Sequence, residues 1–426
     1  MNRRHFGRLV ALAGSAALLP GGRLVPDDTL SAAPLGFVPE NPGEPFWRDV
    51  RGRFLVPRDV NFLNAANLCP TSLPALEALD RNIRLYEAGP SPEIRSDLMA
   101  RGRETSRKLL AEALRVTPEE IVITRNTTEG NNAVSSGLDL KAGDEVVVWD
   151  DNHPSNLNAW RAKAARFGFT VVSVPVPPAH PGADGYLALF TKAFSPRTRL
   201  VAVTHVSSNS GDLLPVAEIC AAARARGILS LVDGAQAFGV LDLDLGTIKP
   251  DFYTGSMHKW PCGPKEKGLL YVNAAVHDRI HPSVVGVYAG AVGISRTLET
   301  HGQRDDASVA AVTDALKFQG SIGRATIEAR SRQLAQALMD GLKKLDGVKL
   351  WTDPAPARSA AIVIFRPGSL DVRKLSAALA ANEKIVCTPR TGDHNPGLRF
   401  APHFYNTMDE MDHAVGAIRN YLATGL

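Results

Sequence analysis

Short apolar runs alternate with longer stretches rich in Ala, Arg and Leu between residues 66 and 287. The short runs carry many β-branched residues and lack a polar face, which is typical of strands buried inside a parallel sheet. The longer stretches, such as 155–167 and 216–226, favour helix. Strands are expected at residues 121–124, 145–149, 170–174, 200–203, 228–232 and 268–272. This alternation predicts an α/β domain with a mostly parallel sheet and crossover helices.

The pattern changes after residue 300. A long helix is expected at 307–345, with a break at Gly320 or Gly323. Two strands and two further helices are expected after it, at residues 361–365, 385–387, 372–382 and 408–422. This mixture predicts a smaller α+β domain at 301–426, following a large domain at 61–300.

The N-terminus differs from both domains. Arg3 and Arg4 precede a short apolar run at residues 9–19, and together they resemble a twin-arginine export signal. The run is shorter than the ~20 apolar residues of a membrane span, so no stable span is expected. We expect a signal peptide at 1–33, a linker or N-terminal segment at 34–60 that is rich in Pro and Gly at about 34–45, and a periplasmic location; an ordinary basic N-terminus is the alternative.

Composition narrows the class of protein further. The chain has 426 residues, 44% of them hydrophobic, and a net charge of +4 without long basic runs. These values indicate a globular protein and argue against nucleic acid as a partner. The four cysteines do not form a disulfide framework in a chain of this length, although a single bridge is compatible with an oxidising periplasm. No metal site is expected.

Two polar clusters at strand ends carry the clearest chemical signal. One strand leads to Asp233 and Gln236, and the next leads to Ser256, His258 and Lys259. A lysine amine among apolar residues can form a Schiff base with an aldehyde cofactor, and a carboxylate can keep a pyridine nitrogen protonated. Both groups are needed by pyridoxal 5'-phosphate (PLP), which we therefore expect as cofactor. A surface lysine and a capping aspartate are the structural alternative.

Other strand ends carry groups suited to the same ligand. Thr127 and Thr128 open a helix, where free backbone N–H groups and the helix dipole favour a phosphate. His153 follows another strand and could stack on an aromatic ring, and Ser208 lies in a polar turn after a third strand. Ligands of open parallel sheets bind beyond the carboxyl ends of the strands, which is where all these residues are expected.

Three motifs in order resemble the class V aminotransferase family of fold-type I PLP enzymes, over roughly residues 61–406. They are Asp-Gly-Ala-Gln at 233–236, Ser-Met-His-Lys at 256–259 and Arg-Phe-Ala-Pro-His-Phe-Tyr-Asn-Thr at 399–407. The family includes cysteine desulfurases and isopenicillin-N epimerase-like proteins. The resemblance implies a mostly parallel seven-stranded sheet in the large domain, a smaller C-terminal domain and a homodimer.

The resemblance also implies a role for each candidate residue. Lys259 would hold the cofactor as a Schiff base and then move protons. Asp233 would pair with the pyridinium nitrogen, Gln236 would contact the ring hydroxyl, and His153 would stack on the ring. The phosphate would be bound by Thr127, Thr128, Ser256 and His258. The substrate would be bound by Arg399, which would clamp its carboxylate, with Asn67 and Ser208 nearby.

Two positions depart from the family pattern. Asn395 stands where cysteine desulfurases carry their nucleophilic cysteine, and an amide cannot attack a bound sulfur. This departure predicts that the protein is not a cysteine desulfurase. Gln303 stands where many relatives place a threonine that reaches the partner subunit's cofactor, so that contact is left open.

These observations predict a PLP-dependent transaminase- or epimerase-like enzyme acting on an amino acid or a peptide-borne amino group. Exported members of the family suggest a second reading, the oxidative or lyase-type tailoring of a siderophore such as pyoverdine or of another secondary metabolite. A non-catalytic periplasmic binding protein is the alternative from another class. It would have no need for Lys259, Asp233, Gln236 and Arg399 together.

Overall fold

A computed structural model describes residues 35–36, 38–392 and 394–426. The expected export signal at 1–33 lies outside the described residues, so the signal and the periplasmic location stay predictions. In the part of the chain that is described, no helix has both the length and the apolar character to cross a bilayer. The same residues contain no group of three or more His, Cys, Asp or Glu side chains arranged to hold a metal ion.

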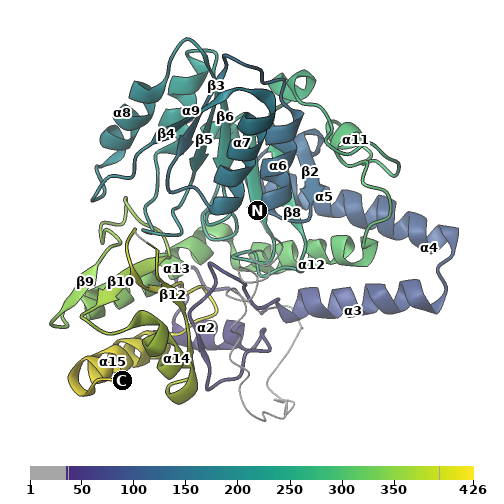
Figure 1. Ribbon diagram of the computed structural model, residues 1–426. Helices are drawn as coiled ribbons and strands as arrows, with labels where there is room; N and C mark the ends of the chain where they lie inside the picture. The colour runs from purple at the N-terminus through teal and green to yellow at the C-terminus, as the bar shows by residue number, and fades with distance from the viewer. Residues whose placement is uncertain (1–34, 37, 393) are drawn as a thin grey trace, which may run out of the picture.

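A seven-stranded sheet forms the centre of the molecule, and it confirms the predicted fold class (Figure 1). Only β8 runs antiparallel to its neighbours, while the other strands are parallel. Four strands begin and end at the predicted residues, namely β2, β3, β4 and β8. The strand order is β2 (Ile121–Thr124), β8 (Gly268–Val272), β7 (Phe252–Ser256), β6 (Leu229–Asp233), β5 (Thr198–Thr204), β3 (Glu145–Trp149) and β4 (Thr170–Val174).

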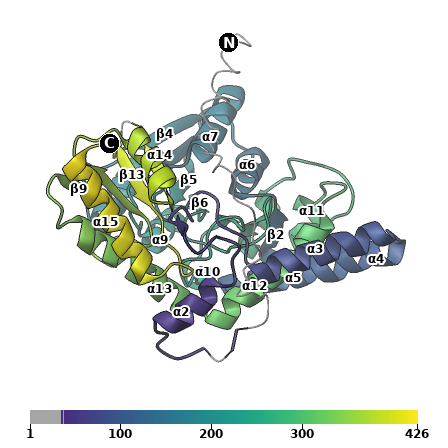
Figure 2. The ribbon, with the colours of Figure 1, turned by 90° about the horizontal axis from the view of Figure 1, so that it is seen from below.

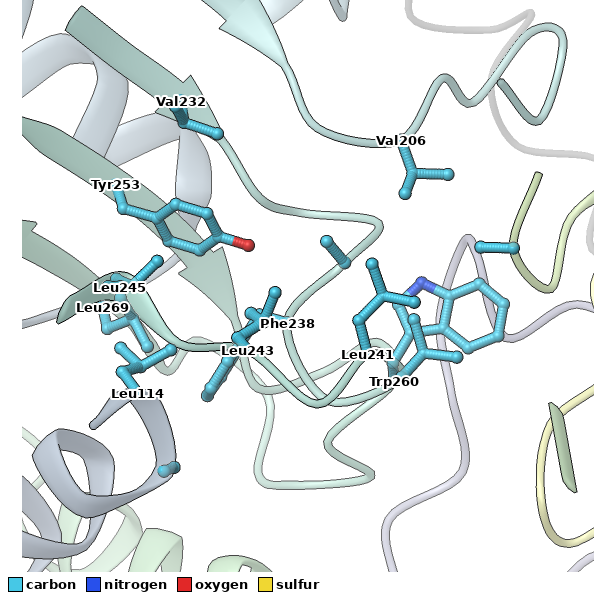
Figure 3. Close-up of a cluster of buried hydrophobic side chains, with 14 of the residues drawn as sticks. Leu114, Val206, Val232, Phe238, Leu241, Leu243, Leu245, Tyr253, Trp260 and Leu269 are labelled. Carbon is cyan, nitrogen blue, oxygen red and sulfur yellow. The ribbon is translucent and has the colours of Figure 1, made fainter. Parts of the chain in front are cut away.

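Both faces of this sheet are buried, which explains the uninterrupted apolar runs. In β3, Val146 and Val148 belong to one hydrophobic cluster, whereas Val147 and Trp149 belong to another. The second cluster continues below the carboxyl ends of the strands, and Figure 3 shows Phe238, Leu241, Leu243, Tyr253 and Trp260 among its members. The crossover helices are α6 (Thr127–Gly137), α7 (Pro154–Phe167), α8 (Ala183–Ala193) and α9 (Val216–Arg224).

Long helices project from one side of the sheet (Figures 1 and 2). The helices are α3 (Leu73–Ala88), α4 (Pro92–Ser96), a π-helical turn (Asp97–Gly102), α5 (Arg103–Leu114) and α12 (Asp306–Ile322). The π-helical turn before α5 packs closely on α12 at Gly102, because a Cβ at this position would lie 2.7 Å from the Cβ of Ala310 in α12. Shorter elements are α10 (Leu245–Ile248), α11 (Ser295–Leu298) and the 3₁₀ turns Pro118–Glu120 and Ala274–Arg279.

A four-stranded antiparallel sheet and three helices form the smaller C-terminal unit. The predicted helix break falls at Gly323, whose φ of 95° suits a residue without a side chain. The strand order is β12 (Thr388–Arg390), β13 (Gly397–Phe400), β10 (Val363–Pro367) and β9 (Val348–Leu350). The helices are α13 (Arg324–Leu342), α14 (Val372–Asn382) and α15 (Met408–Thr424).

The N-terminal segment of the described chain is packed against both units. β1 (Asn61–Phe62) pairs with β11 (Ile385–Val386), so the chain before the large sheet contacts the C-terminal unit. The expected linker at 34–60 contains α2 (Glu44–Arg51), and its Trp47 and Val50 are buried. Residues 44–51 are therefore a packed helix instead of a free linker. The predicted domain bounds otherwise stay predictions.

A buried ionic network fixes the edge strand β2. Glu299 accepts a hydrogen bond from the backbone N–H of Ile123 at 2.6 Å, and its carboxylate pairs with Arg107 and Arg304. Arg107 also donates to the carbonyl of Ile121 at 2.7 Å. Burial alone would raise the pKa of Glu299, but the two guanidinium groups outweigh burial and leave it below its usual value. One carboxylate thus joins β2, α5 and the segment before α12.

We predict that Glu299→Gln lowers the free energy of unfolding by about 3–5 kcal/mol, because it leaves the buried guanidinium group of Arg304 without its counter-charge and leaves Arg107 with Glu104 alone. Urea unfolding followed by circular dichroism measures this loss. Asp80→Asn is the matched control, since Asp80 pairs with Arg84 in an exposed i,i+4 arrangement that contributes little. An equal effect of the two substitutions would contradict a structural role for the buried network.

Candidate active site

Parallel pairing brings the polar strand ends to one edge of the sheet. Thr204 at the end of β5 pairs with Asp233 at the end of β6, and Asp233 pairs with Thr254 in β7. β7 ends at Ser256, and the chain then turns through Lys259. The predicted convergence of these residues therefore rests on the register of three adjacent strands.

Asp233 is buried, with 2% of its surface exposed. Its carboxylate accepts hydrogen bonds from the side-chain amides of Asn131 at 2.9 Å and Asn156 at 3.4 Å, and from the backbone N–H of Ala235 at 3.1 Å. No Lys, Arg or His among the described residues forms an ion pair with it. Since a buried carboxylate is costly without a cation, the site has a place for a positively charged ligand group.

Lys259 lies at the same edge and is half-buried. Burial lowers the pKa of Lys259 to about 8; the negative charge of Asp233 opposes this shift and the positive charge of Arg399 adds to it. Near pH 8 a large fraction of the amine is therefore neutral, which is the form that attacks an aldehyde.

Arg399 supplies a buried cation without a counter-charge. Only 5% of the residue is exposed, and its Nε atom has no hydrogen-bond partner. Its other nitrogens make long contacts, to the carbonyl of Ser208 at 3.4 Å and to Oγ1 of Thr388 at 3.5 Å. Burial, followed by repulsion from Arg390, lowers the pKa of Arg399 to about 9. No carboxylate among the described residues pairs with this guanidinium group, so a ligand carboxylate would fit it.

Two histidines border the site and are neutral at physiological pH. His153 caps the start of α7, where its ring accepts a hydrogen bond from the N–H of Ser155. Desolvation of the ring, followed by the positive charge of Lys259, lowers the pKa of His153. Burial, together with Lys259 and Lys265, lowers the pKa of His258 to about 4. Neither ring therefore adds a positive charge to the site.

The residues expected to bind phosphate fall into two groups. Thr127 and Ser256 are in contact, because the N–H of Thr127 donates to Oγ of Ser256 at 2.9 Å and the two hydroxyls are 2.7 Å apart. Thr128 is exposed and lines a cavity of about 400 Å³ with Glu266 and His301. The start of α6 thus presents hydroxyl groups to a phosphate, whereas the backbone N–H groups of Thr127 and Glu129 already donate to Ser256 and Asn126.

Gln236 contacts the segment 257–267, which connects β7 with β8, contains Lys259 and is called the lysine loop below. Its amide donates to the carbonyl of Ala66 at 2.9 Å and accepts from the indole N–H of Trp260 at 2.8 Å. It therefore joins the segment that precedes α3 to the residue after Lys259. Its expected contact with the cofactor hydroxyl stays a prediction, as do the other assigned roles.

Asn67 is exposed and donates its backbone N–H to the carbonyl of Asn64, and no hydrogen bond among the described residues joins it to Lys259 or Arg399. Gln303 is exposed as well, and the expected homodimer stays a prediction.

Sequence reasoning missed the two amides that hold Asp233. Asn131 follows Thr127 by four residues on α6, so it lies on the same helix face and could have been found from that spacing. Its amide oxygen accepts from the hydroxyl of Thr254, which directs its NH₂ group to Asp233. Asn156 is oriented in the same way by the indole of Trp160. Arg390 was also missed, because nothing in the sequence shows that β12 places it beside Arg399.

These residues fit PLP on the geometry alone. The protonated ring nitrogen of the cofactor would supply the cation that Asp233 lacks, and the start of α6 would accept the phosphate. The charges of Asp233 and Arg399 both act on the amine of Lys259: the first raises its pKa and the second lowers it. The arrangement can hold a charged aldehyde cofactor and a substrate carboxylate at once.

Comparisons with known proteins agree with this fit. The model of the family described as aminotransferase class-V matches residues 74–413. The chain is 31% identical to isopenicillin N epimerase of Streptomyces clavuligerus, over 87% of this chain and 97% of that protein. The solved structure of C-DES, in a lysine-to-alanine mutant with glycine covalently linked to the PLP cofactor, has a TM-score of 0.80 and 28% identity, covering 87% of this chain and 99% of that chain.

The prediction that the protein is not a cysteine desulfurase is wrong. The chain is 28% identical to a probable cysteine desulfurase of Methanothermobacter thermautotrophicus, over 85% of this chain and 95% of that protein. The prediction rested on the loop that contains Asn395, and one loop does not separate the chain from these relatives. Asn395 donates its amide to the carbonyl of Asn209 at 3.3 Å, which gives it a structural role in that loop.

The family match spans most of the chain, and the site holds the lysine and aspartate that PLP requires. The chain therefore belongs to the class V aminotransferase family of PLP-dependent enzymes.

Proposed function

We propose that this PLP-dependent enzyme acts on the amino group of an amino acid, free or within a peptide, by transaminase- or epimerase-like chemistry at Cα. One observation carries the proposal: Asp233 and Arg399 are oppositely charged, buried and without ionic partners, and both act on the amine of Lys259. A bound PLP ring and an amino acid carboxylate would satisfy the two charges together.

Asp233 and Arg399 would have different roles in this reaction. Bound PLP withdraws electrons from the Cα of an attached amino acid and so makes its hydrogen acidic. Asp233 keeps the proton on the ring nitrogen, which this withdrawal requires. Arg399 binds the substrate carboxylate and thereby fixes which bond at Cα faces the ring.

Lys259 is the group placed to move the proton at Cα. Its pKa of about 8 lies near neutrality, which suits a residue that must both accept and return a proton. Protonation of Cα from the face opposite Lys259, by a second proton donor, would give epimerisation, and delivery of the proton by Lys259 to the cofactor carbon would give transamination. The similarity to isopenicillin N epimerase supports the first outcome.

We expect Lys259→Ala to abolish covalent attachment of PLP while the protein stays folded. The wild-type protein should show the near-visible band of a PLP Schiff base, and borohydride reduction should leave a pyridoxyl group on the Lys259 peptide. Absorbance spectra and mass spectrometry of that peptide measure both. Lys265→Ala is the control, because Lys265 lies on the same loop and is hydrogen-bonded to the carbonyl of Cys69. A full band in the Lys259 variant would overturn the assignment.

Chemistry at Cα should appear as hydrogen exchange with solvent. In D₂O, the holoenzyme is expected to place deuterium at Cα of at least one amino acid in a panel of L and D forms, as measured by proton NMR. Retention of the amino group with inversion indicates epimerisation, and a keto acid product indicates transamination. The reaction should depend on Lys259, since its amine carries the proton. Absence of exchange for amino acids that do perturb the cofactor band would refute proton transfer at Cα.

Removing the guanidinium group of Arg399 should weaken carboxylate recognition. We predict that Arg399→Ala raises the apparent Kd of an amino acid by about 10- to 100-fold, the loss expected for charged hydrogen bonds. Titration of the cofactor absorbance measures this Kd, and the matching amine without a carboxylate should bind almost unchanged. Arg366→Ala is the control, since Arg366 lies on the neighbouring strand and donates to the carbonyl of Gly368. Equal losses for acid and amine would argue against the clamp.

A further inference from the structure

Two cysteines far apart in the sequence meet beside the lysine loop. The Sγ atoms of Cys69 and Cys262 are 3.4 Å apart, although 193 positions separate the residues in the chain. Both side chains are buried, with 1% and 0% of their surface exposed. The other two cysteines lie elsewhere: Cys220 is on α9, and Cys387 contacts the hydroxyl of Ser376.

The backbones of both cysteines are fixed next to Lys259. The N–H of Cys69 donates to the carbonyl of His258 at 2.8 Å, and the N–H of Cys262 donates to the carbonyl of Lys259 at 2.9 Å. The N–H of Ser72 donates to the carbonyl of Cys262 at 2.9 Å. Since a disulfide has an S–S length of about 2.05 Å, the two sulfurs need to approach by little more than 1 Å. Oxidation removes the weak S–H contacts of Cys69 to the hydroxyl of Tyr405 and of Cys262 to the carbonyl of Trp260, but it takes no proton from the backbone hydrogen bonds.

We propose that Cys69 and Cys262 are a modification site, at which a reversible disulfide joins the segment 64–72 to the lysine loop. The proposal does not depend on the reaction that the enzyme catalyses. The oxidant is a low-molecular-weight disulfide such as glutathione disulfide.

The exchange has two steps. The thiolate of one cysteine attacks a sulfur of the small disulfide and releases one small thiolate, and the second cysteine then attacks the mixed disulfide and releases the other. The two protein thiols lose two protons and two electrons, and the small disulfide is reduced to two thiols.

The surroundings make Cys69 the first residue to react. Its neighbour Leu68 is 48% exposed, and burial raises the pKa of the Cys262 thiol. The amine of Lys265 is hydrogen-bonded to the backbone carbonyl of Cys69 at 2.6 Å, and its positive charge acts on both thiols, so it favours a thiolate at either cysteine. Local opening of the exposed turn at 67–68 gives the oxidant access.

The crosslink would act on the substrate side of the site. The segment that contains Cys69 also contains Ala66, which accepts from Gln236, and Asn64, which accepts from Thr388 at 2.7 Å. Thr388 in turn contacts Arg399. A covalent link at Cys69 therefore restrains a chain of contacts that runs from the lysine loop to the guanidinium group.

The test uses the full-length holoprotein, incubated with glutathione disulfide or with dithiothreitol. We expect oxidation to give one crosslinked peptide pair, containing Cys69 and Cys262, and to release two glutathione thiols for each crosslink. Peptide mapping by mass spectrometry without reduction, combined with thiol titration, measures both. The oxidised protein should also melt several degrees higher, because the crosslink closes a long loop.

The double variant Cys220→Ser, Cys387→Ser is the control, and it should form the same crosslink as the wild-type protein. Cys69→Ser and Cys262→Ser should each abolish it. Glutathione adducts on separate cysteines, or free thiols at both positions after oxidation, would overturn the proposal.

Comparing the two redox states of the wild-type protein avoids any variant that folds poorly. Amide hydrogen exchange at residues 66–72 and 257–263 should slow several-fold on oxidation, and unchanged rates would overturn the proposed restraint.

Discussion

The organisation of the site depends on a buried carboxylate that the protein does not neutralise. Asp233 ends β6 in the middle of the sheet and receives only amide N–H groups. Taking a carboxylate out of water costs several kcal/mol, and neutral donors offset only part of that cost. The packing that orients Asn131 and Asn156 holds the carboxylate in place, so that a cationic ligand group would gain the remaining stabilisation on binding.

A second buried carboxylate, that of Glu299, differs from Asp233 because it has ionic partners within the chain. Glu299 is surrounded by Arg107 and Arg304 and by the N–H of Ile123, so its charge and its hydrogen-bonding capacity are met within the chain. That network holds β2, whose end leads into the start of α6. Glu104 also pairs with Arg107, so this network has two carboxylates for two guanidinium groups, and it stabilises the fold. The other is unbalanced at Asp233 and at Arg399, and this imbalance marks the place of the ligand.

Much of the fold could be predicted because the sheet is buried on both faces. Strands such as β2 and β3 are buried throughout and almost wholly apolar, so their bounds could be taken from composition alone. The helix α2 was missed because only its buried Trp47 and Val50 distinguish it from a Pro- and Gly-rich linker. At the site, residues with reactive groups were recognisable, whereas Asn131 and Asn156 were not, because amides become informative only when their partners are known. The error over cysteine desulfurases came from weighing one loop, which contains Asn395, above the similarity of the whole chain.

The two unpaired charges also connect substrate binding to proton affinity at Lys259. The positive charge of Arg399 lowers the pKa of Lys259, whereas Asp233 raises it. A substrate carboxylate that paired with Arg399 would cancel the repulsion between the guanidinium group and the amine. The free amine would then hold a proton more readily, which is the property required of a base at Cα. In the proposed reaction, Arg399 would therefore do more than anchor the substrate, because its neutralisation on binding would prepare Lys259 for proton transfer.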